Sequence, residues 1–424
     1  MTLAKKVHRA TSVFVPGGMP SLTYVDRAGR ELEKRLAAVS DNLCKLVTLT
    51  GATKSGKTVL TNKVFPRAAG AVWVDGGSIG SEADLWSTIL DALGGATNIE
   101  KIDEREIDFR GRGDVRAKAG LPLFGEAEIQ GEVEAARKRS KGTKTTLAKS
   151  PRASALAELR RSKTPLVIDD FHYLDRTLQG SVVRALKPLV FEGLPAICIA
   201  IPHRRYDAVK VEREMTGRLE PIDVPAWSVS ELAEIPQIGF PLLNVRIDAA
   251  VTSQLAEEAQ GSPHLMQEFC KRLASHNGIV QTSPHVIEIS SVPRDLFGNI
   301  AAEMGKVVYD KLKKGPRQRS DRKQRPLLQG GTADTYEAVL RGLSKISPGL
   351  DKVDYEQLRA AIRGLLKSDV PQAHEISRVL EKMSEIASND EASTPVLDWD
   401  KDERELHITD PFFAFILKWG ELPS

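Results

Sequence analysis

The sequence predicts an α/β fold built on a parallel β-sheet. Short apolar segments rich in β-branched residues alternate with segments of helical periodicity in the N-terminal half. A glycine-containing loop at residues 51–58 follows the first apolar segment, and Asp169 and Asp170 end the third. Continuously apolar strands that alternate with helices are typical of a parallel sheet covered on both faces. Such sheets bind ligands at the carboxyl ends of their strands, where the loop and both aspartates fall.

The expected strands and helices follow from local patterns. Strands are expected at residues 44–50, 71–75, 165–170, 196–201 and 219–224. Leu32 and Leu36 lie one turn apart and predict a helix within residues 26–36. Ser81 is a residue type favoured at a helix N-cap and introduces a helix at 81–93. Further helices are expected from Val59 onward and at residues 153–161 and 181–191.

A long polar segment interrupts this alternation. Residues 95–150 contain a possible hairpin at 121–134 and a basic run at 137–141. We interpret the segment as a solvated insertion and assign it no chemistry.

The C-terminal half changes from alternation to helices. Helices at 228–235, 249–260 and 263–276 predict a small helical lid. Residues 306–330 are strongly basic and contain glycines and prolines, which favours a linker or loop. Helices at 335–345, 354–366 and 374–387, then strands at 396–399 and 405–408, outline a winged helix-turn-helix. The predicted domains are an N-terminal extension at 1–20, a P-loop core at 21–226, a helical lid at 227–290, a basic linker at 291–333 and a winged-helix-like domain at 334–424.

Composition limits the class of protein. The 424 residues are too many for one compact core, and 41% apolar with 28% charged residues is ordinary for a globular protein. The net charge of +3 does not by itself indicate a nucleic-acid partner. Cys44, Cys198 and Cys270 form no CxxC pair, which disfavours a zinc site and suits reduced, buried thiols. We find neither a signal peptide nor a membrane span, and therefore expect a cytoplasmic protein.

The loop has the chemistry needed to hold a triphosphate. Its sequence is Gly51-Ala52-Thr53-Lys54-Ser55-Gly56-Lys57-Thr58, followed by Val59. Glycines allow backbone N–H groups to wrap the phosphates closely, and the following helix contributes its positive N-terminal end. Lys57 would place a charge between the β- and γ-phosphates, and Thr58 would offer a hydroxyl to Mg²⁺. The loop also stands between a predicted strand and a predicted helix, as this pattern requires.

The two aspartates complete a metal and water site. Mg²⁺ prefers oxygen ligands, and Asp169 at the end of its strand would supply a carboxylate. Asp170 would then polarise the attacking water. Acidic residues in this position can also cap a helix or turn, but the upstream phosphate loop favours the catalytic interpretation.

Other residues have open alternatives. His203, Arg204 and Arg205 follow the fourth strand and are either γ-phosphate sensors or parts of a solvated loop. Arg213 and Arg218 precede the fifth strand and are either surface residues or an arginine finger for a neighbouring subunit. In Gly261-Ser262-Pro263, the proline either starts a helix or, with His264, contacts the nucleotide.

These motifs resemble AAA+-related ATPases of the STAND and origin-recognition-like type. The matching elements, in order, are Tyr24-Val25-Asp26-Arg27 with Glu31-Leu32, which resembles a motif near the adenine; residues 51–58 (Walker A); Leu166-Val167-Ile168-Asp169-Asp170 (Walker B); Gly261-Ser262-Pro263 (the lid motif); and the ending Asp410-Pro411-Phe412-Phe413 with Trp419. The resemblance implies a P-loop sheet with a helical lid and a C-terminal winged helix. It also implies an ATP- and Mg²⁺-dependent switch that hydrolyses ATP slowly and oligomerises when ATP binds.

Three classes of function are compatible with this pattern. The first is an ATPase switch that regulates a partner protein or assembly. The second is a DNA-bound ATPase of the origin-recognition or transposition-regulator kind, with basic residues at 311–325 contacting phosphates. The acidic residues Glu375, Glu381 and Glu385 on the expected recognition helix count against this class. The third, phosphoryl transfer to a small molecule, lacks an acceptor-binding motif, and no NKxD motif indicates a GTPase.

Overall fold

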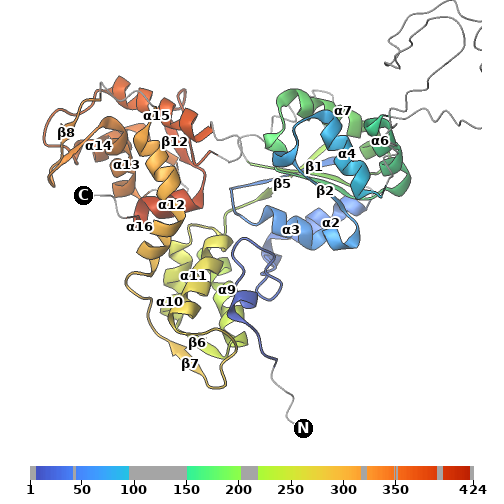
Figure 1. Ribbon diagram of the computed structural model, residues 1–424, viewed down its shortest axis with the longest axis horizontal. Helices are drawn as coiled ribbons and strands as arrows, with labels where there is room; N and C mark the ends of the chain where they lie inside the picture. The colour runs from blue at the N-terminus through green and yellow to red at the C-terminus, as the bar shows by residue number, and fades with distance from the viewer. Residues whose placement is uncertain are drawn as a thin grey trace, which may run out of the picture.

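The structure of the chain is a computed structural model. It describes residues 6–41, 44–94, 150–201, 218–316, 322–347, 349, 352–388 and 395–420. The possible hairpin at 121–134, with most of the insertion around it, lies outside these residues, as do His203, Arg204, Arg205 and Arg213. Figure 1 shows three regions: the sheet with its helices, a helical region that carries α9 to α11, and a C-terminal region that carries α13 to α15.

The core is a five-stranded parallel sheet, as predicted. Its strands are β1 (Leu46–Gly51), β2 (Val72–Asp75), β3 (Leu166–Asp169), β4 (Ala196–Ala200) and β5 (Leu219–Val224). The order across the sheet is β2-β3-β4-β1-β5, and every neighbouring pair is parallel. Strand β1, which lies between β4 and β5, leads into the phosphate loop, and β4 separates it from β3.

Helices cover both faces of this sheet, which explains its continuously apolar strands (Figure 1). Helices α2 (Leu32–Ala37) and α3 (Lys57–Val64) pack over one face, together with Val47 and Leu49 of β1. Leu46 points to the opposite face. The helices on that side are α4 (Glu82–Ala92), α6 (Pro151–Ser162) and α7 (Arg176–Phe191). Short 3₁₀ turns complete the core: η1 (Ala28–Arg30), η2 (Ala38–Ser40), η3 (Arg67–Ala69), η4 (Gly76–Ser78) and η5 (Phe171–Tyr173).

The lid contains the predicted helices and a strand pair that the sequence analysis did not predict. Its elements are α9 (Val229–Leu242), β6 (Val245–Ile247), α10 (Ala249–Glu258), α11 (Pro263–His276) and β7 (Ile287–Ile289), with β6 parallel to β7. The chain start differs from the expected extended lead-in. It forms a short helix, α1 (Ala10–Val13), because Val13 and Phe14 are fully buried in the lid core, where Phe14 packs on Phe240.

The expected linker is also different in the structure. A 19-residue helix, α12 (Leu296–Lys314), occupies most of its first half, and a small β8 (Arg325–Pro326) and β9 (Thr332–Ala333) hairpin follows. Apolar residues recur along α12 at helical spacing, although the dense lysines hide that pattern. Phe297 and Ile300 belong to the lid core, whereas Tyr309 and Leu312 belong to the C-terminal core. Helix α12 therefore ties two regions together.

The C-terminal region has the three helices and the hairpin that the sequence predicts. They are α13 (Thr335–Ile346), α14 (Tyr355–Arg363), α15 (Ala373–Ser388), β11 (Leu397–Asp400) and β12 (Glu405–Ile408). Two elements are additional: β10 (Lys352–Asp354) and α16 (Pro411–Trp419). β10 completes a three-stranded antiparallel sheet in the order β10-β12-β11.

None of the described helices is both long enough and apolar enough to cross a lipid bilayer.

Candidate functional site

The phosphate loop is shaped by two glycines at its ends. Gly51 ends β1 so close to β5 that a Cβ atom there would lie 2.4 Å from the Val224 carbonyl oxygen. Gly56 caps the start of α3 with a φ of 92°, in the left-handed region that favours glycine. Loop and helix therefore leave the sheet in the strand–loop–helix order that the sequence predicts.

Lys57 lies at the base of this loop and is nearly inaccessible to solvent. Its Nζ donates to the carbonyl oxygens of Gly51 and Ala52, each at 2.9 Å. Burial lowers the pKa of Lys57 to about 8, although the nearby charges of Asp170 and Asp169 act in the opposite direction. The site therefore holds a desolvated cation that an anionic ligand would stabilise.

Two hydroxyl groups of the loop lack hydrogen-bond partners. The Oγ1 of Thr53 and the Oγ of Ser55 are both buried, and neither has a hydrogen-bond partner among the residues that the structure describes. A buried polar group that makes no hydrogen bond costs free energy until a ligand or water satisfies it. Together with Lys57 and the backbone N–H groups of the loop, these hydroxyls fit an oxygen-rich anion such as a polyphosphate.

Three carboxylates gather at the carboxyl ends of β2 and β3. Asp75 and Asp169 are register partners on these neighbouring strands. Asp169 is buried, receives a hydrogen bond from Thr58 and accepts the Asp170 N–H at 3.0 Å. The close approach depends on Gly76, since a Cβ there would lie 2.5 Å from the Asp170 carbonyl oxygen. The structure thus brings Thr58 of the loop against Asp169 of β3.

Burial perturbs the acidity of both aspartates at the end of β3. Desolvation, then the charges of Asp169 and Asp75, raise the pKa of Asp170 to about 6. Desolvation also raises the pKa of Asp169, while the Thr58 hydrogen bond partly opposes that shift. A carboxylate and a hydroxyl that meet beside a phosphate loop form a set of oxygen ligands suited to Mg²⁺.

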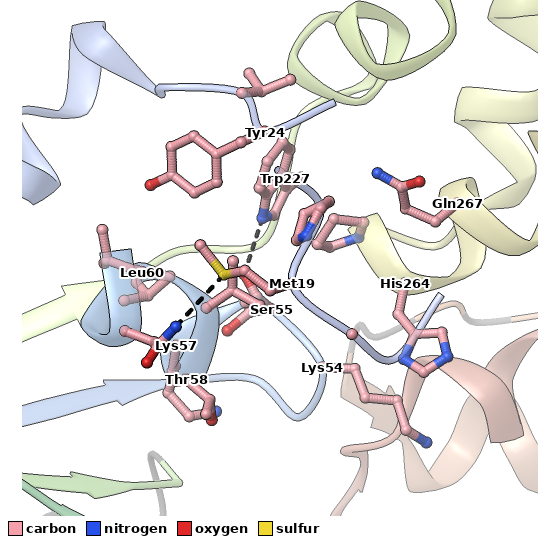
Figure 2. A pocket seen from close by; sticks show the side chains of 18 of the residues that line it. Met19, Tyr24, Lys54, Ser55, Lys57, Thr58, Leu60, Trp227, His264 and Gln267 are labelled. Atoms are coloured by element: carbon pink, nitrogen blue, oxygen red, sulfur yellow. Dashed lines mark hydrogen bonds between the residues drawn. The ribbon is translucent and has the colours of Figure 1, made fainter. Parts of the chain in front are cut away.

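A cavity of about 620 Å³ opens over the loop (Figure 2). Its walls come from the N-terminal segment, the loop, the end of the sheet and the lid. The predicted site residues that line it are Thr53, Lys54, Ser55, Gly56, Lys57, Thr58, Val59, Asp170, Pro263 and His264. Residues 24–27 and Leu32, from the motif that resembles one near the adenine, also line it, whereas Gly51, Ala52 and Asp169 do not. Pro263 also begins α11, so its capping and cavity-lining roles coincide.

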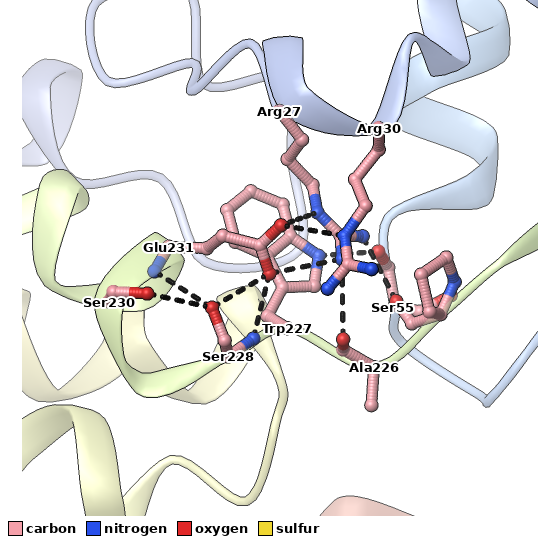
Figure 3. A network of polar contacts seen from close by, with 9 residues as sticks. Arg27, Arg30, Ser55, Ala226, Trp227, Ser228, Ser230 and Glu231 are labelled. Carbon is pink, nitrogen blue, oxygen red and sulfur yellow. Dashed lines mark hydrogen bonds and ion pairs between the residues drawn. The ribbon is translucent and has the colours of Figure 1, made fainter.

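A polar network lies where the chain passes from β5 to α9, at residues 225–228, which we call the hinge (Figure 3). The sequence analysis missed this network. Trp227 Nε1 donates to the Ser55 carbonyl oxygen at 2.9 Å, which links the hinge to the phosphate loop. The buried Arg27 guanidinium bonds both carboxylate oxygens of Glu231, at 3.0 and 3.1 Å, and lies over the Trp227 ring. Burial acts to raise the pKa of Glu231, but the bonds from Arg27 and Ser228 bring it down to about 2. The Ser228-x-x-Glu231 capping box was visible in the sequence; its partner Arg27 was not.

Arg218 does not reach this cavity within its own chain. Its carbonyl oxygen accepts the Leu46 N–H at the start of β1, at the sheet edge opposite the phosphate loop. Its guanidinium lies 5.5 Å from the centre of the Phe191 ring. Its role as an arginine finger for a neighbouring subunit stays a prediction.

The sheet order and the phosphate loop define a P-loop NTPase fold, and comparison with solved structures agrees. The Walker-type ATPase PABY2304 of Pyrococcus abyssi matches with a TM-score of 0.51 and 13% identity, over 92% of this chain and 95% of that one. Two further matches are Cdc6p from Pyrobaculum aerophilum (TM-score 0.41, 14% identity, 96% of each chain) and the Aeropyrum pernix Orc1 protein in complex with DNA (0.45, 12%, 98% and 97%). No protein-family model and no curated protein sequence matches the chain.

Proposed function

We propose that this protein is an ATP-binding molecular switch of the STAND or AAA+ type, which hydrolyses ATP slowly and regulates a partner protein or assembly. The observation that carries the proposal is the meeting of Lys57, Thr58 and Asp170 at one cavity, with Thr58 hydrogen-bonded to the buried Asp169. Burial disfavours the charged forms of Lys57 and of both aspartates; in a magnesium-bound polyphosphate the phosphates would offset the charge of Lys57 and the metal ion those of the carboxylates.

The roles of the residues follow from their positions. The N–H groups of residues 51–58 and the Lys57 ammonium would hold the phosphates of ATP, with Val59 and Pro263 lining the site. Thr58 and Asp169 would hold Mg²⁺, which supplies charge neutralisation of the phosphates. Asp170 would accept a hydrogen bond from the attacking water and orient it.

Contacts between the loop and distant segments support a switch. Trp227 of the hinge and Ser262 of the lid bond the carbonyl oxygens of Ser55 and Lys54, at 2.9 and 3.5 Å. A ligand that rearranges the loop would therefore disturb both contacts, which couples occupancy to lid position.

The DNA-binding alternative draws less support from the structure. This alternative treats the C-terminal region as a winged helix and the basic residues at 311–325 as contacts to DNA phosphates. However, several of those basic residues make ion pairs within the region: Lys313 with Glu337, Arg322 with Asp334, Lys323 with Asp369 and Arg325 with Glu375, at 3.1, 3.0, 2.7 and 3.0 Å. Arg325 is 2% exposed, so its charge is not presented at the surface.

One experiment separates these functions. The protein is sized by light scattering with MgATP, MgADP or no nucleotide, each with and without duplex DNA at low salt. A switch should change its size or shape between MgATP and MgADP without DNA. A DNA-bound ATPase should instead form a complex that dissociates by about 200 mM salt. Identical profiles under all conditions would contradict the proposed switch.

A further inference from the structure

Lys54 points from the phosphate loop to the C-terminal region. Its Nζ lies 2.9 Å from Asp410 Oδ2 and 3.4 Å from the centre of the Phe412 ring. The Asp410 side chain is only 10% exposed, so solvent screens the pair incompletely. Lys54 also has a φ of 59°, an uncommon conformation for a residue with a side chain. A lysine that lines the nucleotide cavity therefore has its charge neutralised by a residue 356 positions away.

Asp410 uses its two carboxylate oxygens for different tasks. Oδ1 accepts the N–H groups of Phe412 and Phe413, at 2.7 and 3.1 Å, and so caps the start of α16. Oδ2 is left for Lys54. The capping task does not require a negative charge, whereas the contact with the lysine does.

Helix α16 extends this contact to the other regions. Phe415 packs in the lid core and Phe413 in the C-terminal core. At the far end of the helix, Lys418 and Trp419 donate to Glu258 of α10, at 2.7 and 2.6 Å. A shift at the start of α16 is therefore transmitted to the lid and the C-terminal region together.

The lid also touches the pair from its own side. His264 lines the nucleotide cavity and lies edge-on to Phe412, with ring centres 4.9 Å apart. The loop, the lid and the C-terminal region thus meet at one cluster, formed by Lys54, Asp410, Phe412 and His264.

We propose that the Lys54–Asp410 ion pair is an autoinhibitory latch that a nucleotide polyphosphate releases by competing for Lys54. The inference rests on the proposed function, because it requires phosphates at residues 51–58. A bound polyphosphate brings several negative charges next to Lys54, attracts its ammonium and repels the Asp410 carboxylate. Conversely, the latch lowers nucleotide affinity, because part of the binding free energy is used to break the ion pair.

The test compares Asp410→Asn with Asp354→Asn. The first variant keeps an oxygen that can cap α16 but removes the charge that holds Lys54. The second is a matched control, because Asp354 caps α14 through the same kind of bonds, to Glu356 and Gln357, far from the loop. Titration with a fluorescent ADP analogue should give a dissociation constant about 3- to 10-fold lower for Asp410→Asn. The value for Asp354→Asn should stay within about twofold of the wild type.

A second measurement needs no nucleotide. Hydrogen exchange of the apo protein should speed up in Asp410→Asn at both residues 51–58 and the start of α16. In a Lys54→Met background, Asp410→Asn should change neither nucleotide affinity nor exchange, because the pair is already broken. Unchanged exchange in the single variant would overturn the latch, as would an unchanged dissociation constant in a protein that binds nucleotide. A wild type that binds no nucleotide would instead overturn the proposed function itself.

Discussion

At the residue scale, the site is organised around charges that the fold buries at a cost in stability. The pKa of Lys57 falls to about 8 and that of Asp170 rises to about 6, and burial is the largest cause of both shifts. Both shifts mean that burial disfavours the charged forms of these two groups. Functional sites commonly give up stability in this way.

Replacing Asp170 should therefore stabilise the empty protein. Asp170→Asn removes a charge that is disfavoured above pH of about 6, and asparagine tolerates the φ of 50° at this position. Because the side chain is partly exposed, we expect a gain of about 1 kcal/mol, or about 2–4 °C in Tm. The gain should be complete near neutral pH and should disappear as the pH falls through 6 toward the ordinary aspartate value of 3.8. Thermal melts at several pH values measure it, and a loss of stability at neutral pH would contradict this picture.

The same variant should lose hydrolysis while it keeps ATP binding. We expect kcat to fall about 100-fold or more, because the water loses its orienting carboxylate. In the wild type, kcat/KM should decline below a pH of about 6, where Asp170 in the free protein takes up a proton. Steady-state phosphate release over a pH series measures both effects. If kcat/KM of the wild type did not change with pH and Asp170→Asn kept full activity, a residue other than Asp170 would have to orient the attacking water.

A site residue could be predicted where the sequence pattern that marks it spans only a few positions. The placement of Lys57, Thr58 and Asp169 near one another was predictable, because loop spacing and a strand ending in carboxylates are visible within a few positions; their roles stay predictions. Arg27 and Asp410 were not predictable in their roles, since their partners Glu231 and Lys54 lie 204 and 356 positions away. No local pattern specifies a pairing between such distant charges.

At the element scale, the phosphate loop depends on the tight packing of β1 against β5. Gly51 pairs with Val224 at the last position of the ladder. A side chain there would be driven into the β5 backbone, and its Cβ would also lie 3.1 Å from Ser55 Oγ. Strand pairing and loop shape are therefore coupled at this one residue.

Gly51→Ala should weaken both the fold and the site. We expect a loss of about 1–3 kcal/mol from overpacking, with weaker nucleotide binding because the loop must shift. Gly29→Ala is the matched control, since a Cβ at Gly29 meets no atom within 4 Å and should change little. Denaturant unfolding and nucleotide titration of both variants measure the effects. Equal stability of the two variants would contradict this expectation, because it would show that β5 can move to make room for the added methyl group.

The predicted bounds were accurate for some elements and too short for others, since α9 extends to Leu242 and not to residue 235, and α7 begins at Arg176 and not at residue 181. Helix α11 has the predicted bounds, because Ser262 and Pro263 mark its start in the sequence. The three-residue strands β6, β7 and β10 were missed, because so short a segment has almost no periodicity of its own. The linker expectation was wrong over α12, where lysines on the outer face masked an apolar stripe that becomes evident only when both of its cores are known.

At the scale of the whole molecule, the lid and the C-terminal region behave as connected parts. Helices α12 and α16 each contribute to both apolar cores, and α16 begins at the phosphate loop. The N-terminal segment adds a further connection, since it is buried in the lid and lines the cavity. A change at the phosphate loop can therefore reach the lid and the C-terminal region through contacts seen in the structure.

The central claim is that this cavity binds MgATP through Lys57. The most direct test is the equilibrium dissociation constant of MgATP for the wild type and for Lys57→Ala. Lys45→Ala is the control, because Lys45 pairs with Glu220 beside the start of β1, away from the loop. We expect Lys57→Ala to bind about 100-fold more weakly, since it loses a charge-assisted contact in a buried site, and Lys45→Ala to bind normally. Unchanged affinity in a folded Lys57→Ala protein would contradict the account.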